Sequence, residues 1–156
     1  VPHPSCDGCA DRSKASLVGL ARVSTRRFAC KARQLRQTES LILSFASACR
    51  IAQVLDNLLS NALDASPARS VVVVGVGTSD GLVELRVRDA GSGLSAEQKA
   101  RAFDRFWRAR TGGGGSGLGL AIARRLVEAD GGTIELCDAT GGGVEAVVRL
   151  PAAPSS

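Results

Sequence analysis

Four polar side chains repeat along one side of the segment RIAQVLDNLLSNALDAS, residues 50–66, whose other side is apolar. Asparagine is a poor residue for the interior of a helix, because its amide competes with the backbone for hydrogen bonds. The stripe is therefore either a face exposed to water or a row of amide oxygens, which are hard ligands suited to Mg²⁺. Its members, at helical spacing, are Gln53, Asn57, Asn61 and Asp64.

A carboxylate with two glycines close behind it follows an apolar segment farther along the chain. Asp89 precedes Gly91 and Gly93 in the pattern D-x-G-x-G, and glycines allow a sharp turn that another group can approach closely. A carboxylate only accepts hydrogen bonds, so it suits an exocyclic amino group such as that of adenine and disfavours the carbonyl of guanine. A turn between a hairpin and a loop explains the same spacing equally well.

The glycine-rich run GGGGSGLGLAI, residues 112–122, leads into a predicted helix. Successive backbone N–H groups at such a helix N-terminus can bind phosphates. A flexible linker has the same composition, so the run by itself leaves both interpretations open.

The segment FDRFWRAR, residues 103–110, places aromatic residues next to arginines. The aromatic side chains are typical of an ordinary core. The arginines either form a solvated face or reach a γ-phosphate. They are Arg105, Arg108 and Arg110.

The elements that must position these residues are predicted clearly from residue 50 onward. Residues 50–66 have the leucine spacing of an amphipathic helix, Asp80-Gly81 predicts a hairpin turn, and Ser95 with Gln98 predicts a capping box that opens a short helix. Helices and hairpins in this order predict an α+β, two-layer sandwich, with a mixed, mostly antiparallel sheet covered on one face by helices. The other predicted elements are a short strand within 41–48, strands over 71–76, 82–89, 133–138 and 144–151, and a helix over 118–130.

The net charge of +5 lies in the first 49 residues, because the rest of the 156-residue chain is balanced. A basic excess confined to one end is typical of a solvated tail, so we expect no nucleic-acid partner. No apolar run reaches the roughly 20 residues that span a bilayer, and no secretory signal opens the sequence, so we expect a cytoplasmic protein without membrane insertion. The expected divisions are a tail over 1–15, a basic segment over 16–49 that is a candidate for the first strand and helix, a domain over 50–151 and a tail over 152–156.

His3, Cys6 and Cys9 have a spacing that metal ligands can have. A closed zinc site takes four ligands, and no second Cys/His pair follows them. We therefore expect a reducible tail rather than a zinc site.

The order and spacing of all these motifs are more specific than any one of them. Together they resemble the ATP-binding catalytic domain of bacterial sensor histidine kinases, a member of the Bergerat ATPase superfamily that gyrase-type ATPases share. The resemblance covers roughly residues 50–151 and implies the Bergerat fold, with ATP and Mg²⁺ as cofactors. The Walker pattern GxxxxGK[ST] is absent from the sequence.

The resemblance also implies roles for particular residues. Asn61 would bind Mg²⁺ through its amide oxygen, and Asn57 would support the metal and the catalytic step. Asp89 would recognise the adenine amino group, while Arg105 or Arg108 would approach the phosphates. The other implied nucleotide-binding residues are Asp64, Gly91, Gly93, Gly115, Ser116, Gly117, Leu118 and Gly119.

Three features depart from the family pattern. Asp64 and Ala65 stand where the family often has Lys and Tyr, and Ala90 stands where Asn or Glu is frequent. A carboxylate in place of a phosphate-facing lysine should weaken nucleotide binding unless an arginine compensates. The phosphoacceptor motif H-[ED]-x-x-[TN]-P is missing, and the one histidine, His3, has no adjacent acid to serve as a base.

These features predict the ATP-binding catalytic subunit of a split two-component histidine kinase. It would transfer the γ-phosphoryl group in trans to a histidine on a separate dimerisation protein, upstream of a response regulator, and the isolated chain would be monomeric. The alternative is a Bergerat-type Ser/Thr kinase, or an ATP-dependent switch protein that binds a partner without phosphotransfer.

Overall fold

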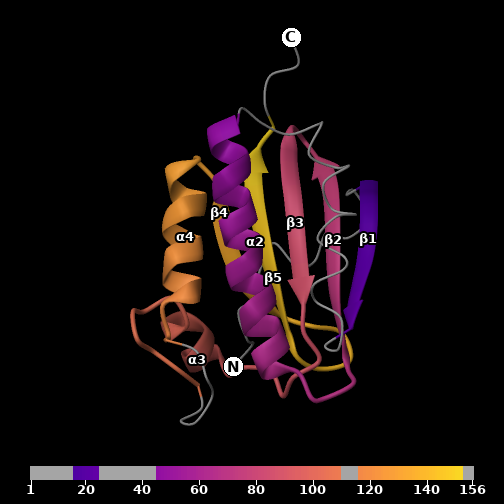
Figure 1. Cartoon of the computed structure of the whole chain (residues 1–156), viewed down its shortest axis with the longest axis vertical. Coiled ribbons are helices and arrows are strands. Elements are labelled where there is room, and N and C mark those ends of the chain that lie inside the picture. Colours follow the sequence, from indigo (N-terminus) through magenta and orange to yellow (C-terminus); the bar gives the residue numbers. More distant parts are fainter. Residues whose placement is uncertain (1–15, 25–44, 110–115, 153–156) are drawn as a thin grey trace, which may run out of the picture.

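The computed structural model describes residues 16–24, 45–109 and 116–152, which form a five-stranded sheet with helices packed on one face (Figure 1). His3, Cys6, Cys9 and Gly115 lie outside these residues, so the structure does not bear on their predicted roles. Within the described ranges, no helix is both long enough and apolar enough to cross a membrane.

The sheet has the strand order β1-β2-β3-β5-β4, and its pairings are all antiparallel. Asp80-Gly81 joins β2 to β3 as a hairpin, and each of these residues has a positive φ, as a tight turn of this hand requires. The α+β sandwich is confirmed, although the described sheet is antiparallel throughout rather than mixed. The strands are β1 (Ser16–Ser24), β2 (Val71–Ser79), β3 (Leu82–Arg88), β4 (Thr133–Asp138) and β5 (Val144–Pro151).

Three helices are present in the described part of the chain: α2 (Phe45–Ala65), α3 (Ala96–Arg101) and α4 (Gly119–Ala129). The apolar side of α2 packs on the sheet through buried residues such as Leu58 and Leu59, and α4 lies beside α2 (Figure 1). Ser95 caps α3 by accepting a hydrogen bond from the Gln98 N–H at 3.2 Å, while Gln98 Oε1 accepts one from the Ser95 N–H at 2.9 Å. The predicted capping box is therefore confirmed.

Two segments near the N-terminus differ from simple expectation. The strand predicted within 41–48 is wrong for residues 45–48, which form the first turn of α2. A short apolar run cannot be assigned to strand or helix by periodicity alone, and here it continues into the long helix. Within the basic segment, residues 16–24 form β1, which pairs with β2 at the edge of the sheet.

Charged side chains occupy the face of the sheet opposite the helices. On β3, Leu85 and Val87 belong to the core, so the alternating Glu84 and Arg86 lie on the other face. The side chain of Glu84 accepts hydrogen bonds from Arg86 Nε at 2.6 Å and from Arg149 Nε at 3.0 Å. We call this set, extended by ion pairs along β4 and β5, the charge ladder; it comprises Glu84, Arg86, Arg88, Glu135, Glu145 and Arg149.

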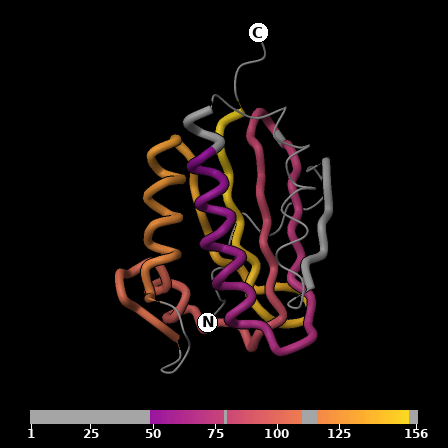
Figure 2. The backbone as a smooth tube through the Cα atoms, viewed as in Figure 1, coloured from indigo at the N-terminus to yellow at the C-terminus, as the bar shows by residue number. Residues whose placement is uncertain are grey.

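The predicted site residues are gathered at one end of the molecule. Figure 2 shows that α2 ends, β3 ends, α4 begins and the turn from β4 to β5 lies at this same end. The helices cross the sheet so that the polar stripe of α2 and the loop after β3 come together there.

Candidate functional site

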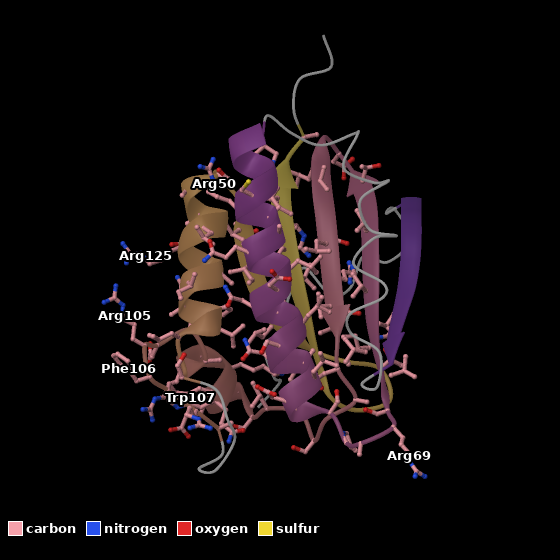
Figure 3. All side chains as sticks on the ribbon, in the orientation of Figure 1. Arg50, Arg69, Arg105, Phe106, Trp107 and Arg125 are labelled. Carbon is pink, nitrogen blue, oxygen red and sulfur yellow. The ribbon has the colours of Figure 1, made fainter. Side chains whose placement is uncertain are left out.

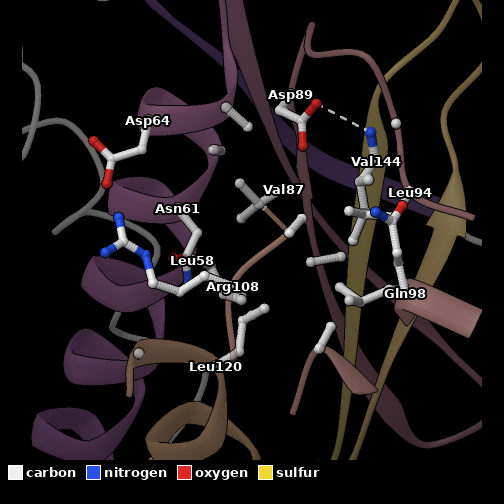
Figure 4. Close-up of a pocket in the computed structure, with 18 of the residues that line it drawn as sticks. Leu58, Asn61, Asp64, Val87, Asp89, Leu94, Gln98, Arg108, Leu120 and Val144 are labelled. Atoms are coloured by element: carbon white, nitrogen blue, oxygen red, sulfur yellow. Dashed lines mark hydrogen bonds between the residues drawn. The ribbon is translucent and has the colours of Figure 1, made fainter. Parts of the chain in front are cut away.

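A cavity of about 650 Å³ opens between the helices and the sheet at this end of the molecule. Pockets of a few hundred to about 1,000 Å³ are typical of small-molecule and cofactor sites. Apolar side chains form a large part of the walls, and polar side chains lie among them, including a group at the end of β3 and another where α4 begins (Figure 4). The apolar lining includes Leu58, Ala62, Val87, Leu94, Trp107, Leu120, Leu136, Val144 and Ala146.

Asp89 forms the first polar place, at the point where β3 ends. Its Oδ1 accepts hydrogen bonds from the Gly91 N–H at 2.8 Å and from the Val144 N–H at 3.0 Å (Figure 4), and its own N–H donates to the Val144 carbonyl at 3.0 Å. Oδ2 accepts no hydrogen bond from the described residues. The carboxylate is thus oriented by backbone groups on two sides and keeps one oxygen for a ligand.

Glycines make this arrangement sterically possible. A Cβ on Gly91 would lie 2.7 Å from the Ala65 carbonyl oxygen, and one on Gly143 would lie 2.6 Å from Asp89 Oδ1. Gly143 also has a φ of +89°, which L side chains rarely adopt. Sequence reasoning singled out Gly91 but missed Gly143 and the Val144 N–H, for which the glycine run before β5 was the available signal.

The second polar place is where α4 begins: Asn61 lines the cavity there, and Asn57, one turn earlier on α2, lies next to it outside the lining. Both residues are half-buried, and the Nδ2 atom of each is buried without a hydrogen-bond partner in the structure. Gly119 opens α4 directly against them, since a Cβ there would lie 3.3 Å from Asn61 Nδ2 and 3.5 Å from Asn57 Oδ1. The amides are therefore neither fully solvated nor paired, a state that a polar ligand would relieve.

The two other members of the polar stripe lie apart from this pair. Gln53 is exposed and does not line the cavity, whereas Asp64 is exposed and does line it. The stripe thus begins on the outer surface of α2 and ends at the cavity, so its two interpretations, solvated face and binding row, apply to different residues.

Of the arginines in the segment 103–110, one lines the cavity and another lies on the outer surface. Arg108 lines the cavity, and its side chain extends toward α2 near Asn61 and Asp64 (Figure 4). Arg105 is exposed, points away from the molecule and lies outside the cavity lining (Figure 3). Between them Phe106 has a φ of 64° and is 72% exposed. The structure therefore brings Arg108, but not Arg105, to the site.

The described part of the glycine run adjoins Phe106 and the start of α4. The Phe106 N–H donates to the Gly117 carbonyl at 2.9 Å, and a Cβ on Gly117 would lie 2.9 Å from Phe106 Cα. Gly117 and Gly119 line the cavity, Leu118 is the N-cap residue of α4, and Ser116 is exposed. The first N–H groups of α4 lie at the cavity, where a helix N-terminus favours an anion.

Comparison with known proteins identifies a family. The chain matches the model for histidine kinase-, DNA gyrase B- and HSP90-like ATPases over residues 47–154. It is 42% identical over 108 residues to the sensor histidine kinase WalK of Bacillus subtilis, and the aligned region covers 65% of this chain and 18% of WalK. The chain spans about a fifth of the length of the curated relatives it matches.

Solved structures agree with this match. The mycobacterial sensor histidine kinase MprB superposes with a TM-score of 0.64 at 27% identity, over 88% of this chain and 100% of that one. Full-length ShkA in complex with AMPPNP has a TM-score of 0.60 at 33% identity, over 69% of this chain and 22% of that one. This chain therefore belongs to the family of histidine kinase-, DNA gyrase B- and HSP90-like ATPases, and the part from residue 47 onward corresponds to the catalytic domain of sensor histidine kinases.

Proposed function

We propose that this chain binds Mg·ATP in the cavity and transfers the γ-phosphoryl group to a histidine on a separate phosphoacceptor protein. One observation carries the proposal. The backbone-oriented carboxylate of Asp89 lies at one side of a cavity with a large apolar part, and the α4 N-terminus with the amide of Asn61 lies at another. Such a cavity suits a ligand with an apolar ring, an amino group and phosphates.

At the base end, Asp89 Oδ2 accepts a hydrogen bond from the 6-amino group of adenine. Gly91 and Gly93 shape the turn beside it, and the apolar side chains of the cavity contact the ring. Guanine has a carbonyl at the same place, so two hydrogen-bond acceptors would face each other. The site therefore prefers ATP to GTP. The structure of ShkA with AMPPNP, an ATP analogue, supports a nucleotide ligand.

At the phosphate end, the N–H groups of α4 and the guanidinium of Arg108 contact the phosphates. No group of three or more His, Cys, Asp or Glu side chains suited to a metal gathers within the described ranges. A cation here therefore relies on oxygens of Asn61, Asn57 and the nucleotide, which are the ligands that Mg²⁺ prefers. The atoms without a partner are the Nδ2 donors of these two amides, which suit phosphate oxygens, while Oδ1 is the atom that would face the cation. When bound, Mg²⁺ supplies neutralisation of the phosphate charge.

Catalysis by this domain consists of positioning and electrostatic stabilisation. A ring nitrogen of the acceptor histidine attacks the γ-phosphorus, and the bond from that phosphorus to the bridging oxygen breaks. ADP leaves with the electron pair, and the proton on the other ring nitrogen passes to a base of the acceptor protein. Asn57 and Arg108 hold the phosphates in line; Arg105 joins them only if its segment turns inward.

Transfer in trans is part of this proposal because the matched domain over residues 47–154 holds no histidine that could accept the phosphoryl group. The single histidine of the chain, His3, has no acidic neighbour, and the relatives are sensor kinases of two-component systems. The acceptor is then a dimerisation protein that carries the H-box motif, and a response regulator receives the phosphoryl group from it.

A second function is favoured by Asp64. This exposed carboxylate lines the phosphate end, where its charge repels a triphosphate. A domain with weakened transfer would act as an ATP-dependent switch that binds its partner, or as a Ser/Thr kinase with a different acceptor.

A transfer assay with γ-labelled Mg·ATP distinguishes these functions. The chain is incubated alone and then with H-box proteins that lack an ATP domain, and Asp89→Asn serves as the inactive control. We expect acid-labile, alkali-stable label on one partner and none on the chain alone. Acid-stable label would identify a Ser/Thr kinase, and self-labelling of the chain would contradict transfer in trans. ATP binding without any label on the partners would favour the switch.

A further inference from the structure

Ser66 follows the last residue of α2 and lies between that helix and the loop that carries Asp89. We infer that Ser66 is a positioning residue, whose hydroxyl fixes the Asp89 loop against α2 and thereby sets the preference of the site for a purine with a 6-amino group. The inference rests on the proposed binding of ATP and goes beyond it, because Ser66 is outside the cavity lining.

Three hydrogen bonds define the position of Ser66. Its N–H and its hydroxyl both donate to the Ala62 carbonyl, at 3.1 and 2.6 Å. Its Oγ in turn accepts a hydrogen bond from the Ala90 N–H at 3.2 Å. A hydroxyl has one hydrogen, and here that hydrogen is directed at Ala62, so a lone pair is free to face Ala90.

The bond to Ala90 acts on the residue next to Asp89. A second close contact adjoins it, because Gly91 packs so tightly against the Ala65 carbonyl that a Cβ would lie 2.7 Å away. On its other side, Asp89 is held by the Val144 N–H of β5. The loop is thus held between α2 and β5, and Ser66 supplies the side-chain hydrogen bond on the α2 side.

This arrangement links the two ends of the proposed nucleotide site. Asn57 and Asn61 are carried by α2, and Asp89 is carried by the loop that Ser66 ties to the end of α2. A shift of the loop would change the distance from Asp89 Oδ2 to the adenine amino group without changing the phosphate end. Loss of the Ser66 hydroxyl should therefore weaken the recognition of the amino group more than the binding of the triphosphate.

The fold should tolerate this loss. Ala90 is exposed, so water can take the place of the hydroxyl at its N–H. The Ser66 N–H keeps its own bond to Ala62. The effect of Ser66→Ala is then a change in geometry rather than a buried donor without a partner.

The test compares ATP with purine riboside triphosphate, which carries hydrogen in place of the 6-amino group. Affinities are measured by calorimetry for the wild type, Ser66→Ala and Ser66→Thr. The control is Ser70→Ala, because the Ser70 hydroxyl also donates to a nearby carbonyl, that of Pro67 at 2.7 Å, but makes no bond to the Asp89 loop. Melting temperatures are recorded for every variant.

We expect Ser66→Ala to lower the affinity for ATP about fivefold, the effect of one hydrogen bond, while the affinity for the purine analogue changes little. Ser66→Thr, which keeps the hydroxyl, should retain the wild-type preference for ATP over the purine analogue. Ser70→Ala should leave this preference unchanged. An equal loss for both nucleotides, no rescue by threonine, or the same shift in Ser70→Ala would each overturn the inference. If the wild type itself shows no preference for ATP, the role of Asp89 in the proposed function fails and the inference fails with it.

Discussion

The charge ladder and the cavity lie on opposite faces of the same sheet, and most of their polar groups differ in whether they are paired. The exception in the ladder is Arg88, whose buried Nε has no hydrogen-bond partner in the structure and lies 3.7 Å from Glu145 Oε1. In the ladder, Glu84 accepts hydrogen bonds from two arginines. Burial lowers the pKa of Arg86, but the hydrogen bonds and charges of Glu84 and Glu145 raise it by more, so the pKa is raised overall. At the cavity, Asn61 in the lining and Asn57 beside it each keep a buried amide nitrogen without a partner. Paired groups stabilise the folded chain, whereas unpaired groups held in place are available to a ligand.

The largest expected effect is on ligand binding, from Asp89→Asn. The substitution replaces one acceptor oxygen by an N–H donor, which would face the donating amino group of adenine. We expect the affinity for ATP to fall about 100-fold or more, as measured by calorimetry. An unchanged affinity in a folded variant would show that Asp89 does not bind the nucleotide. The contrast between the charge ladder and the cavity would then have no functional meaning.

The next effect should come from Asn61→Ala, with Gln53→Ala as its matched control on the same stripe. We expect the affinity for ATP in the presence of Mg²⁺ to fall about tenfold or more, with little change when EDTA is present. Since the substitution deletes an amide that has no partner, the melting temperature should not fall. Gln53 is exposed and outside the cavity, so a loss of similar size in its variant would show that the stripe acts as a whole.

The ladder should show the reverse behaviour in Glu84→Gln. This change leaves Arg86 and Arg149 with a neutral partner, and we expect it to lower the free energy of unfolding by about 1–3 kcal/mol while ATP affinity stays constant. Glu128→Gln is the control, because its pair with Arg124, at 2.7 Å, is half-exposed on a helix and should contribute about 0.5 kcal/mol or less. Urea denaturation measures both. A change in ATP affinity for Glu84→Gln would mean that the two faces are coupled.

The smallest effect should come from Asp64→Asn, which removes a negative charge near the proposed phosphates. Because this residue is exposed, solvent screens its charge. We expect the affinity for ATP in EDTA to rise about two- to threefold, and the change to shrink as salt is added. A loss of affinity only in the presence of Mg²⁺ would instead indicate that Asp64 helps to hold the cation.

Much of the fold follows from the sequence, because from residue 50 onward periodicity, turns and caps point to the same elements. The segment 16–24, SLVGLARVS, was harder to assign, because its apolar and polar residues do not alternate strictly and β1 forms by pairing with β2. At the site, residue types predicted Asp89 and the asparagines, but not which arginine would line the cavity. That choice depends on the backbone at Phe106, whose positive φ no residue type there announces. The Val144 N–H was missed because a backbone donor is marked only by its neighbours in the sequence, here the glycine run before β5.

The turn between β4 and β5 has two parts that will behave differently when homologous sequences are aligned or loops are grafted. At Gly141 a Cβ would have nothing within 4 Å of it, so this outer part has room for extra residues, as surface turns generally do, although its φ of +94° favours glycine at that position. At Gly143 a single methyl group would meet Asp89. We therefore expect insertions and deletions among homologues only in the outer part of the turn. In an alignment, Gly143 should be treated as part of the site with the D-x-G-x-G loop, and not as a variable turn residue.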